Sequence, residues 1–338
     1  MPTWNLAPVD LCGVAVALPK RVVTNADLCA VLDSTPEWIE QKIGVLERRF
    51  LDPEESLDDL MTEAAAAALA AGELSAAEVD VVVTATSSPD YFFPSVGITI
   101  ADRLGIDTSR IVDLTQYACA ASTYALHLAA CLLQEQGVRT ALIVCGERVS
   151  GITDPTDRTT RIFFGDAAAA TVLRRTESGG LLAYDLGHSP HPAVNLATPW
   201  WAPHAEVGGR TEAGRTYMNM DGKVVWDQAI THVPASVRAT LGHAGLAVGD
   251  IAGFALHQAN VRLVREIGKV VGVDPARVPI TGDVLGNTGA ASPLTSLYKL
   301  ATAGLARRDD VIVLGAIGSG FFWGSLCFRL GADLGWAG

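Results

Sequence analysis

The chain has 338 residues, of which 49% are hydrophobic and 18% charged, and this composition predicts a compact globular protein of about two domains rather than a disordered one. Its 37 acidic and 25 basic residues give a net charge of −12 without any long Lys/Arg block, which argues against nucleic acid as a partner. No apolar run reaches the roughly 18 residues that a membrane span needs, which argues against a membrane protein.

The cysteines and histidines give no sign of a metal site. The six cysteines are scattered without a CxxC spacing, and the seven histidines form no HExxH pair. Free thiols fit a reducing compartment, and the first residues lack the basic segment and the long apolar run of a signal peptide. We therefore expect a cytoplasmic protein that holds no metal.

Strand and helix signals alternate along the chain, which is typical of an α/β fold. Apolar segments predict strands at 11–18, 79–88, 111–115, 140–147, 251–260 and 311–318. Cap residues and helical periodicity predict helices at 35–44, 56–71, 95–104, 223–244 and 261–271, with two more after residues 119 and 292. The region 185–222 is less patterned and aromatic, and its Trp200 and Trp201 either line a ligand tunnel or pack on the surface.

The second half of the chain repeats the first. Asn287 lies about 170 residues after Cys119, and the strands that flank these two positions are offset by similar distances. The repeat predicts two packed halves, residues 1–175 and 176–338. Both positions lie at carboxyl ends of strands, where ligands of α/β proteins bind, and His257 also follows directly on an apolar strand. We therefore expect Cys119, His257 and Asn287 to meet in one cleft.

The segment around Cys119 suits a nucleophile. Residues 113–127 predict a strand, a corner of small residues and a helix. A helix N-terminus lowers the pKa of a thiol, and its free N–H groups can bind an oxyanion. A plain buried cysteine would show the same local pattern, as a core histidine and a turn-forming asparagine would at positions 257 and 287.

Six motifs, taken together, resemble those of the β-ketoacyl-acyl carrier protein synthase III family of thiolase-fold condensing enzymes. They are YACAAS with Cys119, HQAN with His257, GNTGAAS with Asn287, DPTDR at 154–158, FGD at 164–166 and GSGFFWGS at 318–325. The similarity runs nearly end to end. It implies a five-layered α/β/α/β/α fold with two duplicated halves, and a cytoplasmic homodimer.

The resemblance implies catalysis by Cys119, His257 and Asn287, with the backbone N–H groups of Cys119 and Ser319 as oxyanion donors. An acyl-CoA would acylate the cysteine, malonyl-acyl carrier protein would then lose CO2, and its enolate would attack the acyl-enzyme. Coenzyme A enters as a substrate thioester, and no cofactor is bound permanently. The residue types suit this chemistry, because a thiolate forms and leaves a thioester readily, and imidazole and amide groups can donate to an enolate oxygen.

The resemblance also implies residues that bind the acyl-CoA. Trp38, Lys42 and Arg158 match positions that hold coenzyme A, although Arg is commoner than Lys at the second. Phe93 matches a residue that reaches into the pocket of the partner subunit, and Ser122 lies near the nucleophile, so both would shape the acyl pocket. Surface packing for Trp38 and solvated charges for Lys42 and Arg158 are the alternatives.

The helix after HQAN carries a basic face. Arg262, Arg265 and Lys269 are spaced by three and four residues, so they share one side of this helix. On a chain of net negative charge, this face predicts a docking site for an acidic carrier protein. A merely solvated face is the alternative.

Three departures from the family pattern affect the pocket. Ala121 and Ser122 replace a glycine and an aromatic residue, Ser319 stands where a glycine is usual, and FGDAAAA replaces FGDGAGA. They predict a specialised paralogue that primes a polyketide or specialised fatty-acid pathway. An acyltransferase of the same fold, acting on a hydroxyl or amine, is the alternative, and a scaffold without chemistry is a third interpretation.

Overall fold

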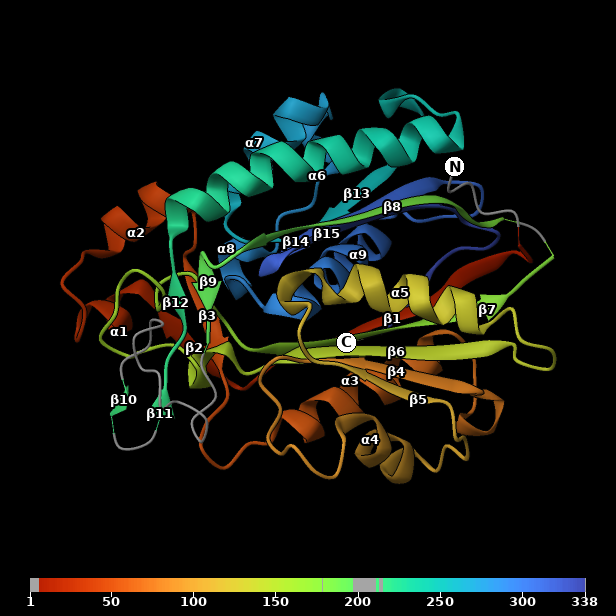
Figure 1. Cartoon of the computed structure of the whole chain (residues 1–338), viewed down its shortest axis with the longest axis horizontal. Helices are drawn as coiled ribbons and strands as arrows, with labels where there is room; N and C mark the ends of the chain where they lie inside the picture. Colours follow the sequence, from red (N-terminus) through yellow and green to blue (C-terminus); the bar gives the residue numbers. More distant parts are fainter. Residues whose placement is uncertain (1–5, 178, 197–210, 213–214, 338) are drawn as a thin grey trace.

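A computed structural model describes residues 6–177, 179–196, 211–212 and 215–337. Trp200 and Trp201, with their predicted role in a tunnel or in packing, lie outside these ranges. Two mixed sheets form the framework (Figure 1). The first has the order β16 (Gly335–Ala337), β1 (Val9–Ala17), β7 (Ala167–Arg175), β6 (Thr140–Glu147), β4 (Val81–Ala85), β5 (Ile111–Leu114). The second has the order β13 (Gly253–Leu256), β14 (Val311–Gly318), β15 (Gly320–Arg329), β8 (Gly180–His191).

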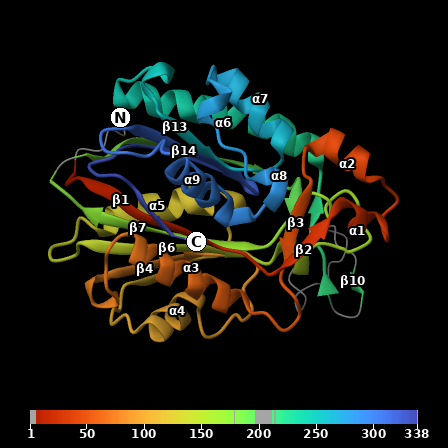
Figure 2. The same ribbon diagram turned by 180° about the vertical axis from the view of Figure 1, so that it is seen from behind.

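The helices complete five layers, α/β/α/β/α, as predicted (Figures 1 and 2). On the outer face of the first sheet lie α3 (Leu57–Ala71) and α4 (Val96–Leu104), and on that of the second lie α6 (Gly222–Ala244) and α7 (Val261–Val271). Between the sheets lie α5 (Ala121–Leu132) and α9 (Ser292–Thr302). Both central helices follow a short 3-10 turn, at Ala118–Ala120 and at Gly289–Ala291, so the corners of the repeat recur in space.

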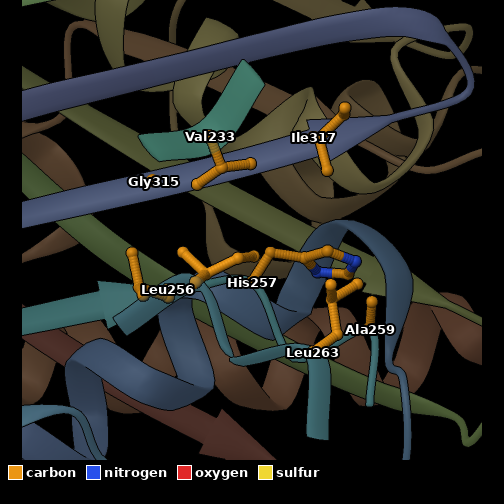
Figure 3. A pocket seen from close by; sticks show the side chains of 8 residues that line it. Val233, Leu256, His257, Ala259, Leu263, Gly315 and Ile317 are labelled. Atoms are coloured by element: carbon orange, nitrogen blue, oxygen red, sulfur yellow. The ribbon is translucent and has the colours of Figure 1, made fainter. Parts of the chain in front are cut away.

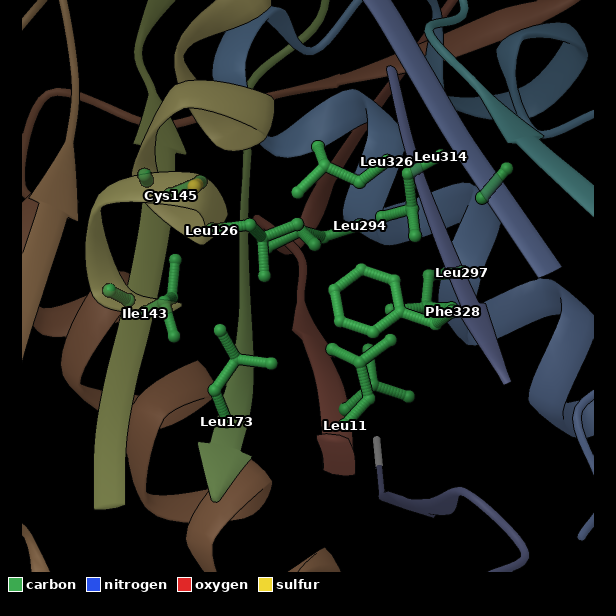
Figure 4. Close-up of a cluster of buried hydrophobic side chains, with 14 of the residues drawn as sticks. Leu11, Leu126, Ile143, Cys145, Leu173, Leu294, Leu297, Leu314, Leu326 and Phe328 are labelled. Atoms are coloured by element: carbon green, nitrogen blue, oxygen red, sulfur yellow. The ribbon is translucent and has the colours of Figure 1, made fainter. Parts of the chain in front are cut away.

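A large apolar cluster fills the space between the two sheets. Leu126 of α5, Leu294 of α9 and Phe328 of β15 are fully buried and gather between the two sheets (Figure 4). Full burial of one such side chain contributes about 1.5–3 kcal/mol, so this cluster binds the two sheets and the central helices into one body. The division at residue 175 stays a prediction, because β16 from the end of the second half joins the first sheet.

A smaller unit lies at one end of the sheets. It contains a hairpin of β2 (Arg21–Thr24) and β3 (Glu47–Phe50), with α1 (Asn25–Cys29) and α2 (Pro36–Ile43). The fully buried Arg48 guanidinium fixes this unit, since it donates to Asn25 Oδ1 (2.7 Å) and to the carbonyl oxygen of Ile162 (2.8 Å). The remaining short elements are α8 (Gly282–Leu285), β9 (Val194–Asn195), β10 (Thr211–Glu212), β11 (Arg215–Thr216) and β12 (Asn219–Met220).

Some predicted boundaries and elements differ from the structure. The strand expected at 251–260 ends at Leu256, because the chain leaves the sheet at His257, and the strand expected at 79–88 covers only Val81–Ala85. The long strands β8 and β15 were not predicted as strands, because glycines and polar residues interrupt their apolar pattern. In the ranges that the structure describes, no helix is long and apolar enough to cross a membrane.

Candidate active site

Cys119 lies in the 3-10 turn Ala118–Ala120, between the edge strand β5 and the central helix α5. Small residues are needed here because Gly318, at the end of β14, packs directly on the turn. A Cβ atom on Gly318 would lie 2.3 Å from the Tyr117 carbonyl oxygen and 2.9 Å from the Cys119 backbone nitrogen. Ala118 has a φ of 46°, so the backbone just before the cysteine is strained.

The surroundings of the thiol favour its protonated form. Burial, and next the charge of Glu147, raise the pKa of Cys119 to about 12. This result corrects the prediction of a lowered pKa: a backbone hydrogen bond at Cys119 favours the thiolate, but the surrounding protein and the nearby acid outweigh it. Cys119 is therefore a thiol at neutral pH, and a reaction at its sulfur must also remove the proton.

Asn287 is held by a backbone connection between two turns. Its N–H donates to the Phe163 carbonyl oxygen (2.8 Å), and its own carbonyl oxygen accepts from the Gly165 N–H (3.0 Å). A Cβ atom on Gly165 would lie 2.1 Å from a backbone oxygen of the opposite turn. The side-chain Oδ1 accepts from the Gly289 N–H (2.9 Å) and from the Cys119 thiol (3.9 Å). The FGD and GNTGAAS segments thus together hold the Asn287 side-chain amide next to the Cys119 thiol.

The His257 ring is buried in apolar surroundings (Figure 3). Its Nδ1 atom is buried without a hydrogen-bond partner, next to a cavity of about 10 Å³ lined by Val233, Leu256, Ala259, Leu263, Ile267, Gly315 and Ile317. Burial lowers the pKa of His257 to about 3. The ring is therefore neutral at pH 7, and only one of its nitrogens carries a hydrogen.

The other residues of HQAN fix the histidine in place. The His257 N–H donates to the Gly315 carbonyl oxygen of β14 (2.8 Å). Gln258 Oε1 accepts from the N–H groups of Thr281 (3.1 Å) and Gly282 (3.2 Å), which tie the segment to the start of α8. Asn260 caps α7 through its side-chain oxygen. The motif therefore offers one residue for chemistry and two that hold its position.

The two predicted oxyanion donors lie on neighbouring turns. The close packing of Gly318 on the Cys119 backbone nitrogen brings the next residue, Ser319, beside the nucleophile turn. The Ser319 hydroxyl donates to the Val194 carbonyl oxygen of β9 (2.9 Å). The Ser319 side chain, which a glycine would lack, is thus held by β9.

The predicted coenzyme A residues gather at the smaller unit. Trp38 on α2 is 38% exposed, and the Arg158 guanidinium carbon lies 5.4 Å from the centre of its ring. Lys42 is exposed on the same helix, and its carbonyl oxygen accepts from Arg262 of α7 (3.3 Å). The predicted nucleotide site therefore adjoins the basic face of α7, where Arg262, Arg265 and Lys269 are all exposed.

The two predicted acyl-pocket residues have opposite environments. Ser122 is fully buried, and its hydroxyl has no hydrogen-bond partner. Phe93 is 90% exposed, so it lines no pocket of its own chain. The structure therefore does not bring these two residues together within one chain.

Comparisons with known proteins match this arrangement. Residues 112–190 match the family model of 3-oxoacyl-[acyl-carrier-protein] synthase III, and residues 241–330 match the model of its C-terminal part. The β-ketoacyl-[acyl-carrier-protein] synthase III of Alkalilimnicola ehrlichii is 35% identical over 94% of this chain and 98% of its own length. The chain belongs to the β-ketoacyl-acyl carrier protein synthase III family. It is therefore an acyltransferase with the condensing activity of that family.

Solved structures of synthases agree with the thiolase-like fold. The 3-oxoacyl-(acyl carrier protein) synthase III of Pseudomonas aeruginosa PAO1 superposes with a TM-score of 0.86 at 34% identity, covering 97% of this chain and 99% of that one. The priming β-ketosynthase of the R1128 polyketide biosynthetic pathway has a TM-score of 0.89 at 29% identity, over 98% of each chain. The predicted thiolase-like fold is confirmed, whereas the predicted roles of individual residues in this synthase stay predictions.

Three residues of the synthase site were not singled out from the sequence. Gln258 and Gly318 hold the histidine and the nucleophile turn, and the carboxyl group of Glu147 is buried near Cys119. The sequence alone could have indicated Glu147, because an acidic residue at the end of the apolar segment 140–147 is unusual. No group of three or more metal-binding side chains occurs among the residues that the structure describes.

Proposed function

We propose that this synthase III takes an acyl group from an acyl-CoA onto Cys119 and joins it to a malonyl group on acyl carrier protein, with loss of CO2. The observation that carries the proposal is the 3.9 Å contact between Cys119 Sγ and Asn287 Oδ1. It places a nucleophile beside an amide that cannot titrate, so the same point can form an acyl-enzyme and stabilise an enolate.

In the first step the Cys119 sulfur attacks the thioester carbonyl of the acyl-CoA. A carbon–sulfur bond forms to Cys119, the bond to the coenzyme A sulfur breaks, and the thiol proton goes to the departing coenzyme A. The backbone N–H groups of Cys119 and Ser319 would bind the oxyanion.

In the second step the malonyl thioester loses CO2, and its enolate carbon attacks the acyl-enzyme. A carbon–carbon bond forms, the bond to Cys119 breaks, and the thiolate takes a proton from solvent. Negative charge collects on the thioester oxygen during decarboxylation. Because Asn287 Oδ1 still accepts from the Gly289 N–H when Cys119 is acylated, its NH2 group is left to donate, and we assign the His257 proton to Nε2 for the same purpose.

A two-stage experiment tests this function against simple acyl transfer. The enzyme is loaded with a panel of acyl-CoAs and analysed by intact-protein mass spectrometry, and malonyl-carrier protein is then added. Condensation gives CO2, a β-ketoacyl-carrier protein and free enzyme. An acyl-enzyme that persists with malonyl-carrier protein, but transfers its acyl group to a hydroxyl or amine acceptor, would establish the alternative instead.

We infer that coenzyme A binds over α2, and the geometry there supports the inference. Trp38 offers a partly exposed ring for stacking on the adenine, and Arg158 and Lys42 offer positive charge for its phosphates. The basic face of α7 adjoins this site, so the carrier protein would dock where its phosphopantetheine arm can follow the same path.

Reversal of one charge on α7 should separate the two substrates. We expect Arg265→Glu to raise the KM for malonyl-carrier protein about three- to tenfold, because it removes a rim charge from an electrostatic interface. Loading of Cys119 from acyl-CoA should not change. Arg308→Glu is the matched control, since Arg308 is exposed beyond the opposite end of β14. Equal effects of both variants in a steady-state assay would contradict the docking site.

A homodimer fits the free edge of the first sheet. Among the described strands the edge strand β5 pairs with β4 alone, and all four of its residues are half-buried. Next to it the segment 91–98 exposes Tyr91, Phe92, Phe93 and Ile98. A second copy would cover this apolar patch, which is the kind of surface that marks a protein interface, and Phe93 would then reach the partner's acyl pocket.

We expect sedimentation equilibrium to give the mass of two chains for the wild type. Phe93→Asp should shift the protein toward one chain, because it places a charge in the apolar interface. Val31→Asp changes an exposed apolar side chain of the smaller unit, just after α1, and should remain dimeric. A monomeric wild type, or a dimer that tolerates Phe93→Asp, would count against the interface.

We also propose a role in priming a polyketide or specialised fatty-acid pathway in the cytoplasm. Two observations support it: the R1128 priming ketosynthase is a structural neighbour, and the unpartnered Ser122 hydroxyl replaces an aromatic residue of the family pattern. A buried hydroxyl favours an acyl group that can form a hydrogen bond with it. The loading panel tests this proposal, because exclusive use of acetyl-CoA would argue for an ordinary initiator of fatty-acid synthesis.

A further inference from the structure

Glu147 is a buried acid that the proposed mechanism does not use. It is the last residue of β6 and is 2% exposed. Its carboxyl oxygens accept hydrogen bonds from the Ser87 N–H (3.0 Å), the Ser88 hydroxyl (2.5 Å) and the Thr86 hydroxyl (3.4 Å). These hydrogen bonds thus hold the segment 86–88, which leads from β4 toward Phe93.

The other side of Glu147 touches the corner that carries Asn287. A Cβ atom on Gly289 would lie 2.6 Å from Glu147 Cγ, so the glycine packs directly on the acid. The Gly289 N–H in turn donates to Asn287 Oδ1, which accepts from the Cys119 thiol. A continuous series of contacts therefore runs from the carboxyl group through Gly289 and Asn287 to the nucleophile.

The charge of Glu147 has few compensating partners. Within the described ranges it forms no ion pair, and burial raises its pKa to about 7 although its hydrogen bonds oppose this shift.

The elements packed against Glu147 present neutral groups to it: Ala167 on β7, the segment 86–88 and Gly289. Two neighbouring charged groups have other partners: Arg148, the next residue, pairs with Asp90, and Asp166, which precedes the paired Ala167, accepts from Ser150 and Leu51. Its charge acts on two thiols, Cys119 and Cys145, and disfavours ionisation of both.

We propose that Glu147 is a positioning residue of this site: its carboxyl group packs the segment 86–88 against the Gly289 corner, and its charge sets how readily the Cys119 thiol ionises. The inference rests on the proposed role of Cys119 as nucleophile. It adds a specific regulation, because the acid changes its charge near neutral pH while the histidine and the asparagine do not.

The pH dependence of Cys119 alkylation follows from this arrangement. A thiol whose pKa lies far above the working pH gives a rate that rises tenfold per pH unit. In the wild type, Glu147 ionises between about pH 6 and 8 and disfavours the thiolate as it does so, so the rise should be less than tenfold per unit there. Below pH 6 the acid is protonated and has no such effect.

The test is the alkylation rate of Cys119 by iodoacetamide, followed by peptide mass spectrometry from pH 5.5 to 9. Glu147→Gln should match the wild type below pH 6, exceed it about three- to tenfold above pH 8, and rise tenfold per pH unit throughout. Asp10→Asn is the matched control, because Asp10 is also buried with a pKa raised to about 6, but its partners are Leu11 and Gly331. The pH dependence of Cys119 alkylation in Asp10→Asn should equal that in the wild type.

Glu147→Ala separates position from charge. It also removes the negative charge, but it leaves the segment 86–88 without its acceptor, so condensation should fall at least tenfold in kcat while Glu147→Gln retains most of it. Identical profiles for wild type and Glu147→Gln would overturn the inference and leave the proposed function intact. Absence of acyl loading at Cys119 would remove the function itself, and this is measured separately by intact mass.

Discussion

Replacing Cys119 by alanine should abolish acyl loading. After incubation with an acyl-CoA that loads the wild type, the intact mass of Cys119→Ala should remain that of the free protein, and product formation should fall at least about 10³-fold. The reason is that Cys119 carries the thiol of the turn Ala118–Ala120, where the acyl group would be bound. Alanine fits the site, because both neighbours of Cys119 in this turn are already alanines.

The control for this prediction is another cysteine of the same region. Cys131 lies on α5 and is exposed, so Cys131→Ala should load at the wild-type rate. An acyl mass on Cys119→Ala, or loss of loading in Cys131→Ala alone, would show that another residue is the nucleophile. Either result would contradict the proposed function.

Asn287→Ala should separate loading from condensation. We expect decarboxylation of malonyl-carrier protein to fall about 10²- to 10³-fold, because the variant loses a donor to the enolate oxygen. Loading should fall much less, since in that step the proposed mechanism gives the Asn287 amide no group to donate to, and its Oδ1 only accepts from the thiol. The acyl-enzyme should therefore accumulate in the mass spectrum while CO2 release stops.

Asn219→Ala provides the comparison for this variant, because Asn219 is an exposed asparagine on β12 and should behave as the wild type. If Asn287→Ala loads and decarboxylates at wild-type rates, the amide is not a donor. The intact Cys, His and Asn set would then no longer favour condensation over acyl transfer.

Much of the fold could be predicted because its signals are local. The helix 261–271 and the strands 140–147 and 311–318 have the predicted bounds, and α3 begins one residue after the predicted start at 56. The repeat of corners about 170 residues apart predicted that Cys119 and Asn287 would lie together, and their side chains are 3.9 Å apart. The five-layered architecture was expected from the family resemblance, and the repeat predicted its two packed halves.

The remaining features depend on residues that are distant in the sequence. The raised pKa of Cys119 comes from burial and from Glu147, neither of which the segment 113–127 contains. Strand β15 is fixed by its pairing with β14 and β8 and not by an apolar pattern of its own. The exposure of Phe93 likewise could not be deduced from its neighbours in the chain.

The backbone connection between Phe163, Gly165 and Asn287 has a consequence for protein engineering. Main-chain hydrogen bonds and glycines without room for a Cβ atom fix the two turns, so directed evolution cannot widen the reaction centre by substitutions there without loss of the fold. New acyl specificities should instead arise at side chains that the backbone does not lock. Ser122 and Phe93 are such positions, and libraries restricted to them should retain a higher fraction of folded, active variants than libraries at the turns.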